Sequence, residues 1–438
     1  MRITLILRCK YTCLWLAFLL CSTATSAIAE SVESTLTLKK ALASTLARNP
    51  QLYQYRFTIE ALNAQEQTSA LRPALALELE VENFVGSGAH KGFDAAETTL
   101  ALSSVIELGG KRQARMSYSN ARINQAEWGQ KAATLDTLGK LTEVFIEGLA
   151  TQANLQLAEE SLALSQSILQ TVKTRSERGA APEAEVMSAQ AALIRAEIRV
   201  ASLQAKLERQ KVLLARFWGE TTPRFHSLTG SLFDFGSSSS FDQLYARALT
   251  SPALQVLASE ARIRDAEITM ARASGRSDLS WRAGIKRFEE TGDSAFTAGI
   301  SVPLFSGKRN KGDVKAALAN RNAVDYAQQD LRLALHARLF EAWSLRKQSI
   351  AAATLTQNTA IPALEKALKL TREGFESGRY RYLDLIAAQE ELLASKQALI
   401  DAATTALISQ ALIEKLTAEP LESKSALSID TTLESSQR

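Results

Sequence analysis

The sequence has few cysteines, and all three lie within its first 21 residues. This segment reads as a secretory signal peptide, because basic residues precede an apolar run over 14–21 and a small-x-small cleavage site follows at 27–29. Residues 1–29 are therefore predicted to be removed, which leaves no thiol for a disulfide or a cysteine metal site. Two alternatives stay open: the run is retained as a membrane helix, which would need roughly 20 apolar residues, or Cys21 carries a lipid.

An excess of charge of one sign is also lacking in the exported chain. The full sequence has 51 Lys and Arg against 47 Asp and Glu, and loss of the three basic residues of the signal peptide leaves 48 against 47. This balance gives no basis for nucleic-acid binding. No later stretch is apolar for long enough to cross a membrane as a helix. If the chain enters a membrane, only a closed β-barrel would satisfy its backbone in lipid.

Histidine is scarce as well, and the three histidines, His90, His226 and His336, fall in different predicted elements. We therefore interpret them as surface or loop residues. The sequence shows no phosphate-binding glycine loop, no nucleophile elbow and no clustered set of zinc ligands. It predicts a protein that is not an enzyme and that has no cofactor or metal site of its own.

Proline is absent from two long stretches, between Pro73 and Pro182 and between Pro303 and Pro362. Because proline breaks the interior of a helix, residues 111–177 can form one helix roughly 100 Å long. Leucines recur there at seven-residue spacing, which predicts a coiled-coil seam, with a glycine at the one missing step. Those positions are Leu141, Gly148, Leu155, Leu162 and Leu169. In the second half of the chain, Pro362 either starts a helix or kinks a longer one.

Three landmarks occur twice in the same order, at offsets of 202, 197 and 199 residues. The paired segments are 49–52 with 251–254, 108–112 with 305–309, and 178–190 with 377–389. This pattern predicts an internal duplication with its seam near 218–240.

The hydrophobic period changes from about 3.6 to 2 between the helices of each copy. Alternation of apolar and polar residues predicts two β-hairpins with strands long enough to span a membrane. The alternating segments are 74–83 and 100–106 in the first copy, and 279–286 and 296–304 in the second. A half-buried hairpin of a soluble protein would alternate in the same way. Four strands cannot close a water-filled barrel, so a pore would need several copies of the chain.

Each predicted long helix ends at a glycine, Gly179 or Gly378, which is a typical helix C-cap. A carboxylate follows near the start of the next helix, Glu185 in the first copy and Asp384 in the second. The helix dipole alone would favour such a carboxylate. If several subunits converge, the same carboxylates would form a ring that selects for cations.

Together these features resemble the TolC-like outer-membrane efflux family over about residues 36–416. The duplicated order, the Val-x-x-Leu-Gly-Gly-Lys-Arg junction at 105–112 and the Gly-x5-Asp-Leu-x-x-Ala-Gln tip at 378–389 carry the resemblance. It implies a mainly α-helical fold with a membrane β-barrel part. Long helical hairpins would form a trimeric periplasmic tunnel, and each chain would give four strands to a shared twelve-stranded barrel. The junction looks most like the branch that serves heavy-metal (cobalt–zinc–cadmium type) resistance–nodulation–division pumps.

The expected organisation follows this scheme along the chain. The segments are a signal peptide (1–29), first-copy N-terminal helices (30–73), a first outer-membrane hairpin (74–108), first-copy long helices (109–217, tip near 178–185), an equatorial linker (218–250), a second-copy helix (251–277), a second outer-membrane hairpin (278–306), second-copy long helices (307–418, tip near 377–384) and a C-terminal tail (419–438).

The resemblance also implies a gate at the helical tips. In the family, an aspartate of the first copy pairs with a tyrosine and an arginine of the second, and these positions hold Glu185, Phe375 and Tyr380 here. Because Phe375 has no hydroxyl, we expect Glu185 to accept a hydrogen bond from Tyr380 or to pair with Arg379 or Arg381.

The family's double aspartate constriction is half kept, because Asp384 matches the first position and Ala387 occupies the second. One carboxylate ring should bind blocking cations less well than two. The positions that contact the periplasmic adaptor protein in the family correspond to Arg178, Gly179, Ala180, Ala181, Pro182, Ser377 and Gly378.

The sequence therefore predicts a passive outer-membrane channel subunit of a tripartite efflux system, with heavy-metal cations as the expected cargo. Its expected partners are two further copies of the chain, a periplasmic adaptor, an inner-membrane pump of the resistance–nodulation–division type and outer-membrane lipid, with no nucleic acid. A channel for drugs or for type I protein secretion is an alternative of the same class. A soluble periplasmic coiled-coil scaffold without a pore is an alternative of another class.

Overall fold

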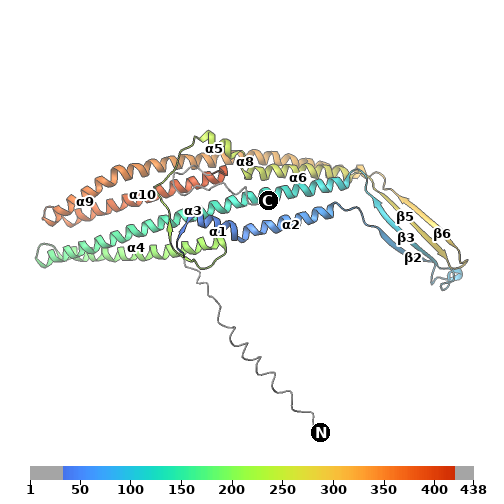
Figure 1. Cartoon of the computed structure of the whole chain (residues 1–438), viewed down its shortest axis with the longest axis horizontal. Helices are drawn as coiled ribbons and strands as arrows, with labels where there is room; N and C mark the ends of the chain where they lie inside the picture. The colour runs from blue at the N-terminus through green and yellow to red at the C-terminus, as the bar shows by residue number, and fades with distance from the viewer. Residues whose placement is uncertain (1–32, 420–438) are drawn as a thin grey trace, which may run out of the picture.

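The computed structural model describes residues 33–419. The predicted signal peptide, Cys21 and all but the first residue of the expected C-terminal tail lie outside this range. The described chain is long and narrow, with helices along most of its length and a four-stranded sheet at one end (Figure 1). No helix among these residues is both long enough and apolar enough to cross a membrane.

The helices repeat in two sets, as the duplication predicts. The first set is α1 (Leu38–Arg48), α2 (Pro50–Ser69), α3 (Lys111–Glu177) and α4 (Glu183–Ala215). The second set is α5 (Phe241–Ala248), α6 (Pro252–Ser274), α7 (Ser306–Arg309), α8 (Lys311–Leu355), α9 (Ile361–Glu376) and α10 (Tyr382–Thr417). Helices α2, α3, α6 and α8 run side by side toward the sheet, and α3, α4, α9 and α10 reach the opposite end (Figure 1).

Helix α3 has the bounds that the absence of proline predicts, 67 residues without interruption. Leu141 and Leu169 of the predicted seam are buried. Gly148 occupies the missing leucine step because the side chain of Leu228 packs there, and a Cβ on Gly148 would collide with it. The glycine therefore lets a strand from elsewhere in the chain approach α3 closely.

Helix α8 continues into α9 through a π-helical turn, Thr356–Ala360, in which the backbone stays helical. Pro362 follows this turn at the start of α9. A proline lacks the N–H that a continuous α-helix requires, and the shift of hydrogen-bond register at a π-turn accommodates it. Of the two alternatives for Pro362, the structure shows the proline inside a longer helix.

The two hairpins form one antiparallel sheet in the order β2-β3-β5-β6, joined through the pairing of β3 with β5. The strands are β2 (Ala76–Glu82), β3 (Glu97–Ile106), β5 (Leu279–Phe288) and β6 (Ser294–Ser301). One face presents aligned apolar side chains to solvent, with Leu77 73% and Phe296 90% exposed. Glu78, Glu80 and Glu82 alternate with this set along β2, so they lie on the other face.

A two-stranded parallel sheet of β1 (Glu33–Thr37) and β4 (Phe225–Thr229) was not predicted. Residues 30–73 had been assigned to helices alone, so this assignment was incomplete. Each strand has five residues, and their pairing bridges almost 200 residues of sequence. Local periodicity cannot reveal such a contact. Together with Trp218, the strand pair packs against the middle of α3 and the C-terminal half of α10 in a hydrophobic core.

Candidate functional site

The two helical tips lie together at the end of the molecule opposite the sheet (Figure 1). At both tips the chain turns by the same device. Gly179 and Gly378 have φ of +73° and +76°, and the next residue donates its N–H to a carbonyl five residues back, at 2.8 Å in each case. This is the pattern of a glycine C-cap, and it confirms the role predicted for both glycines.

In the second copy, Asp384 closes the first turn of α10. Its Oδ2 accepts the backbone N–H of Arg381 at 2.9 Å, and its Oδ1 lies 3.2 Å from Nη2 of the same residue. The backbone hydrogen bond, followed by the guanidinium, lowers the pKa of the Asp384 carboxyl below its usual value. Asp384 therefore stabilises the helix start as a carboxylate at neutral pH.

In the first copy, Glu185 occupies the same position of its helix, the third residue of α4. The residue before that helix is Pro182, which has no N–H to offer. Within the described chain, the half-buried Glu185 side chain forms no hydrogen bond and no ion pair. Its charge acts instead on Tyr382, which is only 5% exposed. Burial raises the pKa of the Tyr382 phenol, and the nearby negative charge of Glu185 raises it further.

The three partners predicted for Glu185 are engaged elsewhere in the single chain. The ring of Tyr380 packs over Gly374, Arg379 donates to Ser377 Oγ at 3.0 Å, and Arg381 contacts Asp384. The pairing of Glu185 with any of them stays a prediction. Tyr382 was not predicted, because the family position falls on Tyr380.

Phe375 is held by a contact that the sequence did not reveal. Its ring is 2% exposed, and the guanidinium carbon of Arg175 lies 4.4 Å from the ring centroid. Arg175 also donates to the carbonyl oxygen of Phe375 and to that of Ala180. This residue therefore ties the end of α3 to the end of α9. A cation in the last turn of a helix is a common feature, so the pattern of residues around Arg175 does not single it out.

A cavity of about 240 Å³ lies behind the tips, between α3, α4 and α10. Tyr382 and Gln389 line it and are 5% and 6% exposed. Among the described residues, neither the Tyr382 hydroxyl nor the Gln389 amide forms a hydrogen bond. Arg195, Arg199 and Glu390 also line the cavity. The two copies thus meet here around polar groups whose hydrogen-bonding capacity is not used within the chain.

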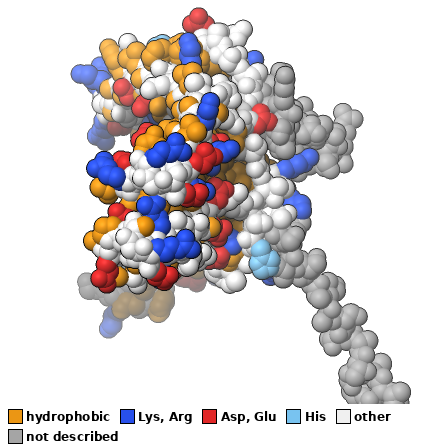
Figure 2. All heavy atoms as spheres, turned by 90° about the vertical axis from the view of Figure 1, so that its left-hand side faces the viewer, with side chains coloured by type: hydrophobic (Ala, Val, Ile, Leu, Met, Phe, Trp, Pro, Cys, Tyr) orange, Lys and Arg blue, Asp and Glu red, His pale blue; other side chains and the backbone are white. Residues whose placement is uncertain are grey.

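The seven predicted adaptor-contact residues form the outermost turns of both tips, and all are exposed except the half-buried Ala181. Figure 2 looks onto this end and shows basic, acidic and hydrophobic side chains intermingled on its surface. The surface has the mixed character of a protein contact, but its partner stays a prediction.

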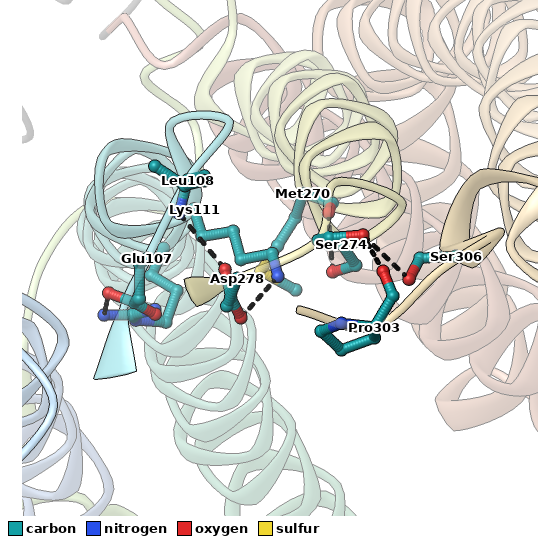
Figure 3. Close-up of polar contacts among 10 residues, drawn as sticks. Glu107, Leu108, Lys111, Met270, Ser274, Asp278, Pro303 and Ser306 are labelled. Carbon is teal, nitrogen blue, oxygen red and sulfur yellow. Dashed lines mark hydrogen bonds and ion pairs between the residues drawn. The ribbon is translucent and has the colours of Figure 1, made fainter. Parts of the chain in front are cut away.

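The junction between sheet and helices joins the two copies at the other end (Figure 3). Asp278 accepts the backbone N–H of Leu108 at 3.1 Å and the ammonium of Lys111 at 2.7 Å. Gly109 and Gly110 both have φ of +75°, and Gly109 lies directly against the stem of Arg276. The backbone role predicted for this glycine pair is confirmed.

Within residues 33–419, no group of three or more His, Cys, Asp or Glu side chains is placed to hold a metal ion. The titratable residues of the tips are distributed over two helix starts and one buried cavity. This arrangement can present charge to a passing ion, and it offers no preformed coordination sphere.

Known proteins resemble the chain in sequence and in fold. The profile of the family described as outer membrane efflux protein matches residues 41–220 and 244–419, one match to each copy. The cobalt-zinc-cadmium resistance protein CzcC of Cupriavidus metallidurans is 26% identical over 68% of this chain and 72% of its own length. The nickel-cobalt-cadmium resistance protein NccC of Alcaligenes xylosoxydans xylosoxydans is 23% identical over 74% and 72%.

Among solved structures, the outer membrane protein VceC of Vibrio cholerae superimposes with a TM-score of 0.71 at 18% identity, covering 88% of this chain and 97% of that one. At this identity the likeness shows the fold. Because the family profile matches both halves of the chain, the protein belongs to the outer membrane efflux protein family.

Proposed function

We propose that the chain is one subunit of an outer-membrane channel through which heavy-metal cations leave the cell passively. The family places the protein in the outer membrane as an efflux component. The metal class is supported by the relatives named for resistance to cobalt, zinc and cadmium and to nickel, cobalt and cadmium.

The observation that carries the channel is the exposed apolar face of the four-stranded sheet. Leu77, Leu79, Phe296 and Ile300 are each at least 70% exposed on this face. Leaving such side chains in water forfeits roughly 1.5–3 kcal/mol each, and an exposed patch of this kind marks an interaction surface. Lipid would cover it in the proposed channel.

The opposite face of the sheet carries charge that is balanced by ion pairs. Arg282 lies 3.0 and 2.9 Å from Glu78 and Glu80, and Lys286 lies 2.7 and 2.6 Å from Glu82 and Glu97. Both basic residues are on β5 and reach across β3. A polar face opposite an apolar one suits a water-filled lumen, and four strands from each of three chains would enclose it.

The assembly that fits this arrangement is a homotrimer with a helical tunnel in the periplasm. Its tips would dock on a periplasmic adaptor through 178–182 and 377–378, and the adaptor would link them to an inner-membrane pump. In a trimer, Asp384 would form one carboxylate ring and Glu185 a second one. Such rings favour cations, while the pump would choose the cargo.

Deletion of the gene tests the cargo. Growth of the deletion strain on zinc, cobalt and cadmium should fail at metal concentrations that the parent tolerates, and growth on a drug panel should be unchanged. Sensitivity to drugs alone would favour the drug channel, and loss of a secreted protein would favour type I secretion. Fractionation separates the other class, because a scaffold would stay soluble whereas a channel yields heat-modifiable trimers in the outer membrane.

A further inference from the structure

The junction of the second copy carries five basic side chains without a counter-charge. They are Arg272 in the last turn of α6, Arg276 just after that helix, Lys308 and Arg309 in α7, and Lys311 at the start of α8. All five are exposed. Within the described part of the chain, none of them forms an ion pair with a carboxylate.

Three of these cations line one open hollow of about 370 Å³. Arg272, Arg276 and Lys311 share it with Gly275, Gly307, Asn310 and Val314, and no acidic residue is among the lining residues. Asp313 is close in sequence, in the first turn of α8, but it does not line the hollow. Like charges held together without a counter-charge repel one another, so an anion in the hollow would be stabilised.

The first copy shows that this charge is not a by-product of the duplicated junction. There, Lys111 pairs with Asp278, Arg112 donates to the carbonyl of Ala70, and Arg115 pairs with Glu107. The junction cations of the first copy are thus used within the fold. Those of the second copy remain available to a partner.

The hollow lies where the exposed apolar face of the sheet ends. Leu304 and Phe305 are 73% and 74% exposed, and Lys308 and Arg309 follow directly in α7. Phe305 has φ of +63°, a conformation that residues with a side chain rarely adopt. An exposed aromatic ring beside basic side chains is the arrangement found where a membrane protein meets the headgroup layer.

We propose that this hollow binds the phosphate of an anionic phospholipid headgroup in the leaflet that faces the helices. A guanidinium group can donate two parallel hydrogen bonds to the oxygens of one phosphate. Lys311 adds a third positive charge to those of the two arginines. The acyl chains would lie along Leu304 and Phe305, which free phosphate cannot contact. The inference rests on the proposed function, because it requires the apolar face of the sheet to lie in a bilayer.

Lipid titration of the purified full chain in a non-ionic detergent tests the site. Trimer dissociation on heating is followed while phosphatidylglycerol, phosphatidylcholine or inorganic phosphate is added at matched ionic strength. Phosphatidylglycerol should stabilise the protein at a concentration at least tenfold below that of phosphatidylcholine, and inorganic phosphate should have no such effect.

The variant Arg272→Gln/Arg276→Gln/Lys311→Gln should raise the half-saturating concentration of phosphatidylglycerol by roughly a hundredfold, about fivefold for each cation near an anionic lipid surface. The Arg276 stem packs on Gly109, so replacing Arg276 could also disturb the fold. The double variant Arg272→Gln/Lys311→Gln keeps that contact, and its half-saturating concentration of phosphatidylglycerol should still rise about 25-fold. A matched control removes three exposed lysines from the helices near the tips, far from the sheet. It should change the half-saturating concentration of phosphatidylglycerol less than twofold. It carries Lys173→Gln, Lys366→Gln and Lys369→Gln.

Three results would overturn the site: equal half-saturation in the double variant and the control, equal stabilisation by phosphatidylcholine, or equal stabilisation by inorganic phosphate. Failure of the proposed function is distinguishable from these, since it appears as wild-type protein that does not conduct ions in planar bilayers.

Discussion

The two helical tips show how duplicated segments diverge in the use of one carboxylate. Glu185 and Asp384 both stand third in their helices, after a glycine-capped turn. In the second copy, the backbone N–H of Arg381 donates a hydrogen bond to the Asp384 carboxylate. In the first copy, Pro182 has no N–H, so the Glu185 carboxylate lacks that partner. The second tip therefore uses its acidic residue for its own helix, and the first tip retains one for a contact with another group.

The tips differ also in how they are packed. The Phe375 ring of the second copy is 2% exposed, and Arg175 of the first copy covers it. The link between the copies thus runs from a cation of one to a ring of the other. Changes at this link should have larger effects than changes at either carboxylate.

Phe375→Ala should give the largest loss. Truncation of a buried phenylalanine costs about 3–5 kcal/mol through lost transfer energy and a residual cavity. Limited proteolysis at the tips and chemical denaturation should both report the change. Leu383→Ala is the control, because Leu383 is 67% exposed at the same tip; a control as damaging as Phe375→Ala would contradict the assignment of Phe375 to the core.

Arg175→Met should come next. It keeps much of the stem and removes the cation over the ring together with the hydrogen bond to the Phe375 carbonyl, at a cost of about 1.5–3 kcal/mol. In planar bilayers the closed channel should leak more than the parent. Lys173→Met, an exposed lysine two residues away, should leave both stability and leak unchanged.

Asp384→Asn should lower the preference for cations over anions several-fold, because it removes one carboxylate ring. It should also loosen the start of α10, seen as faster amide exchange there. The folded-state pKa of Asp384 is lowered, so its stabilising effect is present above the ordinary aspartate value and is lost as the pH falls through the lowered pKa. An unchanged reversal potential in Asp384→Asn channels would remove this carboxylate from the selectivity of the pore.

Glu185→Gln should have the smallest effect on stability, since no hydrogen bond or ion pair of Glu185 within the described chain is lost. Its effect should appear in the assembled channel as a higher leak, if Glu185 latches a neighbouring group. Glu183→Gln, two residues earlier in α4, is the control. A double variant with Tyr382→Phe separates the partners: additive leaks would show that Glu185 and the Tyr382 hydroxyl act independently.

The sequence was sufficient for the parts of the fold that depend on local pattern. The absence of proline and the Gly109–Gly110 pair gave the bounds of α3, and alternation located both hairpins. The pairing of β1 with β4 was not predictable, because it joins segments almost 200 residues apart. The π-turn before Pro362 was not predictable either, since proline alone allows a helix start or a kink.

The sequence predicted where the residues of the candidate site lie, but not which side chains they contact. Family spacing located Glu185, Asp384 and Phe375 at the tips. It could not show that Arg175 lies over Phe375 or that Tyr382 is the tyrosine near Glu185. Both contacts depend on which helices pack side by side, and the spacing of residues along one helix does not encode that.

The order of the strands in the sheet affects how each subunit assembles and enters the membrane. Pairing of β3 with β5 places the two hairpins side by side, so β2 and β6 are both outer strands with one row of backbone groups unpaired. A lone subunit would thus have two unpaired edge strands beside an exposed apolar face, and this combination promotes aggregation. Joining of subunits and entry into lipid should therefore be coupled events, and a monomer is expected to be short-lived unless a chaperone shields it.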